Sequence, residues 1–211
     1  MLKLDLKKDL KTLYAPSSKK VELVDVPEFN FIQIDGAIEP DATPGTSPGF
    51  QEAMQALYGA AYTLKFMLKL RSADPVDYPV MALEGLWWVE DGNFFIDQPG
   101  NWKYTVMILQ PEVITPELFA EAIQQLCRKK PSPAIPRLRL ARFHEGLCIQ
   151  TMHIGPYATE PETVARMHAF AEQNDLNVQV GKHHEIYLGN PLRADPAKLK
   201  TVLRLPVVRK E

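Results

Sequence analysis

The segment HHEIYL, residues 183–188, places two imidazoles, a carboxylate and a phenol in one strand-like stretch. Because alternate side chains of a strand point to opposite faces, His183, Glu185 and Tyr187 share one face. A carboxylate directed into a cleft is suited to act as a general base. We therefore expect Glu185 to be the catalytic residue, with Tyr187 beside it, and the opposite face, which carries His184, to be apolar. The alternative is a glutamate that faces solvent on an edge strand.

Metal, nucleophilic and phosphate-binding chemistries find no matching motif. Neighbouring strand side chains point apart, so His183 and His184 are poorly placed to share an ion, and the sequence has no HExxH motif. It has no GxSxG elbow or glycine-rich phosphate loop, and neither Cys127 nor Cys148 has a histidine at a meaningful spacing. We expect no metal site, no cofactor and two buried free thiols.

Tryptophans mark the segment of the first half that corresponds to HHEIYL. Aligning GLWW with EIYL matches Gly85 with Glu185 and Trp87 with Tyr187, so Trp87 is expected to face the same groove. A slip of one residue would direct Trp88 there instead, and both tryptophans are kept as candidate ligand-binding residues. The alternative is a tryptophan pair that only fills the core.

Further aromatic residues extend the candidate pocket. Trp102 and Tyr104 lie in the next strand-like segment and are expected to complete one wall. Tyr58, Tyr62 and Phe66 recur at i, i+4 and i+8 beside the apolar stripe of a helix, so they either line the pocket or widen the buried stripe. All five are candidate ligand-binding residues.

The elements that must position these residues follow one order twice. Hydrophobic periodicity and breaker residues predict a short helix over 5–14, strands over 20–26 and 29–38, a helix over 50–70, strands over 78–90 and 102–110, a helix from Thr115, strands over 137–143 and 147–154, a helix over 161–173, and strands over 178–188 and 199–208. The repeated strand-strand-helix-strand-strand order favours two similar lobes related by a pseudo-twofold axis, with a ligand groove where they meet.

The domain organisation follows from this repeat. We expect one domain over 1–211, with a first module at about 20–111, a connecting helix at about 115–130 and a second module at about 137–211. The proline-rich stretch Pro131–Pro136 is the strongest linker candidate.

Composition excludes several classes of function. Apolar residues make up 45% and charged residues 24% of the chain, as in an ordinary folded protein rather than a disordered one. The formal net charge is −2 and the basic residues are spread along the chain, so no nucleic-acid partner is expected. The N-terminal stretch does not look like a signal peptide, and no apolar run approaches the roughly 20 residues needed to span a bilayer, so no membrane association and a cytoplasmic location are expected.

Two long segments carry a family resemblance. HIGPYATEPETVARMHAF and KHHEIYLGNPLRADPAKLKTVLRLPV resemble the two hallmark motifs of the GyrI-like small-molecule-binding family: His-x-Gly-Pro-Tyr before a helix, then Glu-x-Tyr-Leu with a downstream strand ending in Pro-Val. LYGAAYTLKF, ALEGLWWVEDG and DLKKDLKTLYAPS resemble the stand-alone branch of that family. The likeness therefore extends over nearly the whole chain.

The resemblance implies an α+β fold: tandem βαββ modules with pseudo-twofold symmetry that form a curved antiparallel sheet, with helices on one side and a central ligand cleft. It also implies residue roles. Glu185 matches the pocket carboxylate, Tyr187 the aromatic residue two positions later, and His153 and Tyr157 the residues that flank the Gly-Pro turn.

The same resemblance implies binding of lipophilic, planar or cationic compounds. A subset of free-standing members hydrolyses the strained cyclopropane of DNA-alkylating cyclopropanoid compounds within an aromatic cage, and the Trp87-Trp88 strand makes the sequence resemble that subset. Non-catalytic sequestration or sensing stays open, as does a homodimer. A protein partner such as DNA gyrase ranks last because the sequence shows no acidic patch that mimics DNA.

Overall fold

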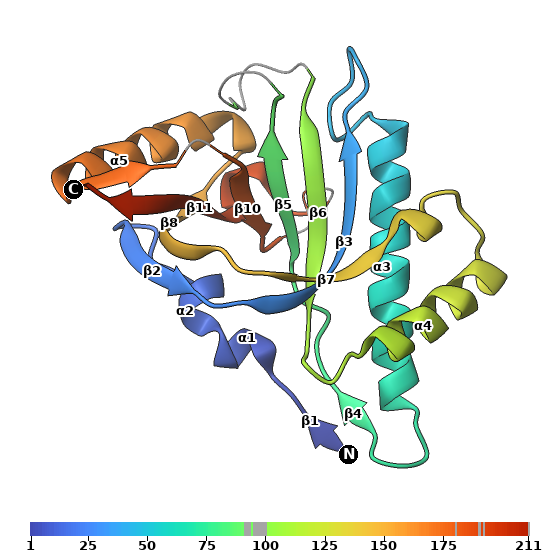
Figure 1. Ribbon diagram of the computed structural model, residues 1–211. Helices are drawn as coiled ribbons and strands as arrows, with labels where there is room; N and C mark the ends of the chain where they lie inside the picture. The colour runs from blue at the N-terminus through green and yellow to red at the C-terminus, as the bar shows by residue number, and fades with distance from the viewer. Residues whose placement is uncertain (91–93, 95–100, 180, 190, 192, 211) are drawn as a thin grey trace.

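The computed structural model describes residues 1–211 except 91–93, 95–100, 180, 190, 192 and 211. A strongly curved antiparallel sheet dominates the described chain (Figure 1). Its strands are β2 (Glu22–Val26), β3 (Phe29–Ala37), β5 (Leu83–Trp88), β6 (Lys103–Gln110), β7 (Arg139–Phe143), β8 (Gly146–Ile154), β9 (Leu176–Val178), β10 (His183–Tyr187) and β11 (Lys200–Arg209). A short parallel pair, β1 (Leu2–Lys3) with β4 (Val76–Asp77), lies apart from it.

The helices begin where the sequence provides caps. They are α1 (Leu6–Asp9), α2 (Lys11–Tyr14), α3 (Pro48–Lys69), α4 (Pro116–Lys129) and α5 (Glu160–Gln173), with 3₁₀ turns η1 (Ile135–Arg137), η2 (Tyr157–Thr159) and η3 (Pro196–Lys198). The Ser47 side chain accepts a hydrogen bond from the Phe50 amide at the start of α3, and Thr115 caps α4 in the same way, as expected. A proline fits the first helical turn in both helices because its missing N–H has no partner to lose there.

The strand order is symmetric about its centre. It runs β2-β8-β11-β10-β5-β6-β3-β7, so matching β2, β8, β11 and β10 with β7, β3, β6 and β5 gives the same order from either end. The pseudo-twofold axis therefore passes between β10 and β5, where Glu185 pairs with Gly85. The two halves also exchange strands: β2 pairs with β8 of the second half, and β7 pairs with β3 of the first.

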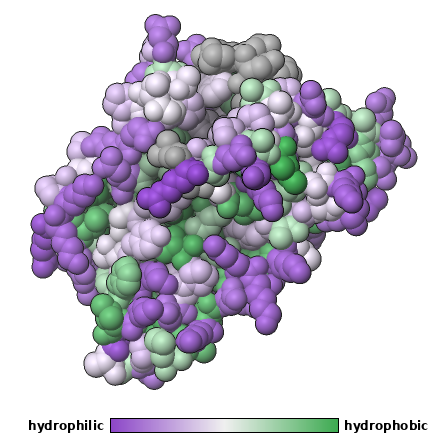
Figure 2. All heavy atoms as spheres, turned by 180° about the vertical axis from the view of Figure 1, so that it is seen from behind, coloured by the Kyte–Doolittle hydropathy of each residue, from purple (hydrophilic) through white to green (hydrophobic). Residues whose placement is uncertain are grey.

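The two long helices of the halves lie on one side of the sheet, in agreement with the expected α+β fold. Phe50 of α3 packs against Trp87 of β5, and α5 brings Glu160 close to Glu185 of β10, so both helices cover the face that carries odd-numbered residues of β5 and β10. Figure 2 shows the molecule from behind, where hydrophobic residues gather near the middle and hydrophilic residues form much of the rim. The short α1 and α2 cover the opposite face, since Tyr14 of α2 hydrogen-bonds Glu84 of β5.

Three expected elements differ in extent. The helix expected over 5–14 breaks into α1 and α2 at Leu10, whose backbone leaves helical geometry. The strand expected over 178–188 is two strands, because β9 pairs with Val207–Arg209 of β11 whereas β10 pairs with residues 201–204 of β11. The strand expected over 78–90 is shortened to β5. The expected loop at 91–101 lies outside the described residues, except for Phe94 and Asn101.

Candidate functional site

Glu185 lies at the centre of the sheet and is 3% exposed, so it is not the solvent-facing glutamate of an edge strand. Its backbone neighbours are Gly85 on β5 and Leu203 on β11. A Cβ at Gly85 would lie 2.7 Å from Trp87 Nε1 and 3.2 Å from Tyr187 Oη, too close for an unshifted side chain. The glycine therefore lets two polar aromatic groups meet directly over the centre of the sheet.

Tyr187 and Trp87 form the polar part of this aromatic group. Trp87 Nε1 donates a hydrogen bond of 2.7 Å to Tyr187 Oη, and the Glu185 carboxylate lies close enough to influence the Tyr187 phenol. Burial and then the charge of Glu185 raise the pKa of the Tyr187 phenol well above its usual value. Tyr187 is therefore a neutral donor. Trp88 points the other way, with Lys182 Nζ 4.1 Å from its ring centroid.

Aromatic rings surround Trp87. The centroid distances from Trp87 are 5.7 Å to Phe50, 5.8 Å to Tyr104, 6.1 Å to Trp102 and 6.4 Å to Phe94. The structure thus brings Trp87, Trp102 and Tyr104 together, as the aromatic wall requires. Phe50 and Phe94 were missed, because one was assigned only to the buried stripe of its helix and the other to a loop.

A second carboxyl group, Glu160 at the start of α5, lies close to Glu185. Its side chain is 0% exposed and neither carboxyl oxygen has a hydrogen-bond partner, although the Thr201 hydroxyl approaches without reaching hydrogen-bond geometry. Burial and then the charge of Glu185 raise the pKa of Glu160 to about 10. No sequence motif marks Glu160, because a glutamate in the first turn of a helix is ordinarily exposed.

His183 and Tyr157 complete the surroundings of Glu185. His183 Nε2 is 3.3 Å from Glu185 Oε1, and the His183 ring stacks on Phe94 with centroids 5.5 Å apart. The Tyr157 ring meets the Tyr187 ring edge-on at 6.0 Å, and burial and then the charge of Glu185 raise the pKa of Tyr157 to about 12. Tyr157 therefore lies beside the acid, in the position that the Gly-Pro-Tyr motif implied.

His153 faces α5, and both of its ring nitrogens contact residues of the turn that follows β8 and of α5. Its Nδ1 is 2.9 Å from Thr163 Oγ1, and its Nε2 is 3.2 Å from the Pro156 carbonyl and 3.3 Å from Thr159 Oγ1. These contacts tie the end of β8 to the start of α5. The geometry supports an anchoring role for His153 more directly than contact with a ligand.

Tyr58, Tyr62 and Phe66 are placed away from Glu185. They stack in succession along α3, and the exposed fractions of Tyr62 and Phe66 are 48% and 47%. Tyr62 and Phe66 line a groove between α3 and α4 together with Met67, Leu70 and Lys129, among others. The structure therefore does not bring these two rings into the group around Trp87.

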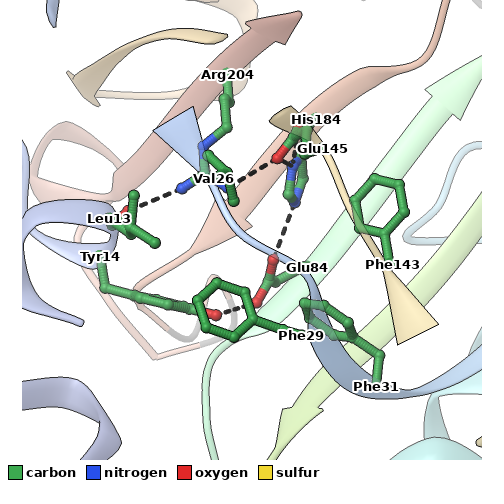
Figure 3. Close-up of a pocket in the computed structure, with 10 residues that line it drawn as sticks. All are labelled: Leu13, Tyr14, Val26, Phe29, Phe31, Glu84, Phe143, Glu145, His184 and Arg204. Atoms are coloured by element: carbon green, nitrogen blue, oxygen red, sulfur yellow. Dashed lines mark hydrogen bonds and ion pairs between the residues drawn. The ribbon is translucent and has the colours of Figure 1, made fainter. Parts of the chain in front are cut away.

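The reverse face of the same strands is not the apolar face that was expected. His184 is 1% exposed, with Nε2 3.0 Å from Glu84 Oε2 and Nδ1 2.9 Å from Glu145 Oε1. Arg204 Nη1 donates to Glu145 Oε2 at 2.9 Å, and the Tyr14 hydroxyl donates to Glu84 (Figure 3). We call these five residues the ionic cluster. Sequence periodicity missed it, because its members come from five separate segments.

The charges of the ionic cluster balance. Burial opposes the charge on His184, but Glu145 and Glu84 outweigh it and raise the His184 pKa to about 9. Burial likewise acts against the Glu145 charge, but His184 and Arg204 outweigh it and lower the Glu145 pKa to about 2. The cavity beside the cluster leaves about 10 Å³ for the centre of a water molecule, room for about one water. The cluster is suited to hold the strands in register rather than to admit a substrate.

Fold and site together define a class: an α+β protein with a pseudo-twofold antiparallel sheet and a buried carboxylate among aromatic rings at its axis. The chain belongs to the family of the GyrI-like small molecule binding domain, whose model matches residues 19–208. The resemblance read from the sequence motifs is thereby confirmed. No described helix is long and apolar enough to cross a membrane.

Solved structures extend the comparison. An uncharacterized conserved protein from Listeria innocua is 42% identical, with a TM-score of 0.87 and a match covering 97% of this chain and 100% of that chain. A hydrolase from Listeria innocua is 41% identical, with a TM-score of 0.85 and coverage of 98% and 100%. The EcmrR C-terminal domain is 13% identical, with a TM-score of 0.54 and coverage of 90% and 98%, and shares the fold. No curated protein matches the chain.

Proposed function

We propose that this protein binds flat, lipophilic small molecules against the Trp87 ring group and hydrolyses the cyclopropane of cyclopropanoid DNA-alkylating compounds. The observation that carries the proposal is Glu185: a 3% exposed carboxylate whose neighbours are aromatic rings and phenols. Similarity to the Listeria hydrolase, at 41% identity over nearly the whole chain, supports a hydrolytic reaction. The biological role would be detoxification of xenobiotics.

The proposed reaction adds one water across a strained carbon-carbon bond. Glu185 takes a proton from a water molecule, and the oxygen of that water attacks the less hindered cyclopropane carbon. The ring bond breaks, its electron pair moves into the conjugated dienone, and the carbonyl oxygen becomes a phenolate that then takes up a proton. Tyr157 and Tyr187 are neutral phenols beside the acid and could donate toward that oxygen. Aromatic walls would hold the substrate in a reactive orientation and exclude bulk water.

Glu185→Gln tests the base. General-base catalysis contributes typically about 10² to 10⁴ in rate, so turnover of a cyclopropanoid should fall by that factor while binding, followed by tryptophan fluorescence, persists. Mass spectrometry would detect hydrated product in excess over protein for the native chain. Glu162→Gln, at an exposed position of α5, is the matched control and should keep full turnover. Undiminished turnover in Glu185→Gln would show that another group is the base.

Non-catalytic binding is the second candidate. A carboxylate enclosed by rings suits a lipophilic cation, because the charge and the ring faces both favour positive charge. This function predicts a stoichiometric complex with a cyclopropanoid and no hydrated product. It also predicts that Glu185→Gln weakens binding of cations more than binding of neutral planar compounds, a preference that would suit multidrug binding.

We also propose that residues 1–211 act as a single domain, with modules at about 20–111 and 137–211 joined through the helix at about 115–130. The exchanged strands β2 and β7 support this, because each half needs a strand from the other to complete its edge. Limited proteolysis within Pro131–Pro136 should leave the two fragments associated. Separation of two folded fragments after cleavage would contradict it.

A further inference from the structure

Glu160, His183 and Glu185 form a compact group that we call the acid-imidazole cluster. One ligand atom from each residue lies within 4.8 Å of the others. Glu160 comes from the first turn of α5, whereas His183 and Glu185 are alternate residues of β10 that share one face. The cluster therefore joins a helix of the second half to the central strand of the sheet.

Two of the three ligand atoms already have the spacing of metal ligands. His183 Nε2 and Glu185 Oε1 are 3.3 Å apart. Nitrogen and oxygen ligands bind zinc at about 2.0–2.2 Å, so neighbouring ligands of a tetrahedral ion lie roughly 3.3–3.6 Å apart. Glu160 lies within 4.8 Å, so a small side-chain rotation would bring its carboxylate to the same ion.

Glu160 provides an independent sign that a ligand is bound here. Both of its oxygens are buried and have no hydrogen-bond partner, which is unfavourable for a carboxyl group in either protonation state. Among the described residues, His183 is the only basic side chain within 4.0 Å of either carboxylate of the cluster. In a metal complex both carboxyl groups would be deprotonated and the imidazole neutral, so the three ligands would carry a charge of −2, which a divalent cation would neutralise.

The surroundings of the cluster would hold its ligands in place. The Tyr187 phenol lies beside Glu185 and is itself fixed by Trp87 Nε1, while Phe94 stacks on the His183 ring. Outer contacts of this kind orient ligating side chains and tune metal affinity. Three protein ligands leave a fourth position for a water or a ligand oxygen, the pattern of catalytic rather than structural zinc sites.

We propose that Glu160, His183 and Glu185 bind one divalent transition-metal ion, with zinc as the best fit to the mixed imidazole and carboxylate set. The expectation of no metal depended on His183 and His184, which do point apart, and on the lack of an HExxH motif, and it did not consider a ligand from another element. This inference goes beyond the proposed function, since it assigns a binding role to Glu160 and His183, which the proposed reaction does not use.

Zinc titration of the full chain tests the inference without any substrate. Protein freed of metal with a chelator and dialysed should bind one equivalent of Zn²⁺ by calorimetry, and Co²⁺ should give a visible absorption band of a low-symmetry site. Glu160→Gln and His183→Gln should each weaken binding at least tenfold. Glu162→Gln and His168→Gln change exposed residues of the same helix and should bind as the native chain does.

Thermal unfolding gives a second measurement. A ligand that binds only the folded state stabilises it, so excess Zn²⁺ should raise the Tm of the native chain and of both control variants but not that of Glu160→Gln. No Zn²⁺ binding by the native chain, or binding unchanged by Glu160→Gln and His183→Gln, would overturn the inference. Turnover that persists in chelator and is lost in Glu185→Gln would leave the proposed function standing without a metal.

Discussion

The two faces of the central strands β5 and β10 differ in how their charged groups are satisfied. On the reverse face, His184 and Glu145 each contact an oppositely charged group within 3.0 Å, and Arg204 pairs with the same glutamate. On the face toward α3 and α5, Glu185 lies 3.3 Å from His183 and beside the Tyr187 phenol, and Glu160 makes no hydrogen bond. Both faces are buried, so burial alone does not separate them.

The difference separates a structural site from a functional one. A buried polar group with all its hydrogen-bond partners helps to specify how the strands pack. A buried polar group without a partner destabilises the folded state, because it has lost its hydrogen bonds to water and gained none in the protein. A buried polar group without a partner is therefore a candidate position for a bound ligand or ion that supplies the missing interaction. By this criterion, the ionic cluster stabilises the sheet, and the Glu185 face is the one we propose as the binding site.

Breaking the ionic cluster should have the largest effect on stability. Arg204→Met leaves the Glu145 charge with one partner fewer in a buried setting, and breaking a buried pair in this way costs about 3–5 kcal/mol. Chemical denaturation would measure the loss of unfolding free energy. Lys198→Met removes an ion pair whose lysine side chain is 80% exposed and should change stability little. If the two substitutions lowered the unfolding free energy equally, the claim that the ionic cluster stabilises the sheet would be contradicted.

Acid should destabilise the protein through the same cluster. The Glu145 pKa falls from 4.5 to about 2 on folding, so its stabilisation is fully present above about pH 4.5 and is lost as pH falls toward 2. At about 1.4 kcal/mol for each pKa unit, the loss is roughly 3 kcal/mol. Asp77 also has a pKa lowered to about 2, through hydrogen bonds from Lys65 and Lys69, but its side chain is 21% exposed, against 3% for Glu145.

The salt dependence of the acid transition separates the contribution of Glu145 from that of Asp77. High ionic strength screens exposed charges far more than buried ones, so the Glu145 part of the acid transition should persist in 1 M salt. Unfolding free energies measured between pH 5 and pH 2, with and without salt, would show it. A transition that salt removes completely would assign the acid sensitivity to the surface instead.

Filling the space opposite Glu185 should have an intermediate effect. Gly85→Ala places a methyl group 2.7 Å from Trp87 Nε1, so the indole must shift away from Tyr187. Overpacking of this kind costs about 1–3 kcal/mol, and ligand binding should weaken with it. Gly45→Ala is the control, because the nearest atom to its Cβ lies at 3.7 Å. A Gly85→Ala protein of native stability and affinity would show that the close approach is unimportant.

Removing one hydrogen bond on the Glu185 face should have the smallest effect. Trp87→Phe keeps a ring but loses the donor to Tyr187 Oη, at a cost of about 0.5–1.5 kcal/mol. Trp88→Phe, on the other face of the same strand, leaves that donor intact. Binding of a planar aromatic probe, measured by calorimetry, should weaken in the first variant only. The reverse result would assign the ligand wall to Trp88.

Much of the fold could be predicted because its signals are local. The cap at Thr115, the apolar stripe of α3 and the alternation in β10 each follow from neighbouring residues, and the structure confirms them. The repeated order of elements indicated two halves. The exchange of β2 and β7 between the halves could not be predicted, because strand pairing over long sequence distances leaves no mark in the local pattern.

Only those residues of the candidate site that lie on the motif-bearing strands could be predicted. Register placed Glu185, Tyr187 and Trp87 on one face, and the pairing of Glu185 with Gly85 agrees with the alignment of the two halves. Glu160 and the ionic cluster were missed, because their partners meet only after the chain has folded. Tyr62 and Phe66 have the spacing of a pocket wall but lie on an exposed part of α3, which periodicity alone cannot distinguish.

The position of β11 has a consequence for how the chain is made. This strand ends near the C-terminus, yet it lies inside the sheet between β8 and β10. β11 can join β8 to β10 only after all the other strands of the sheet have been synthesised, and such distant pairings slow folding. A nascent chain should therefore expose unpaired edges of β8 and β10 until β11 has been made, and deletion of Lys200–Arg209 would remove an inner strand rather than an edge strand.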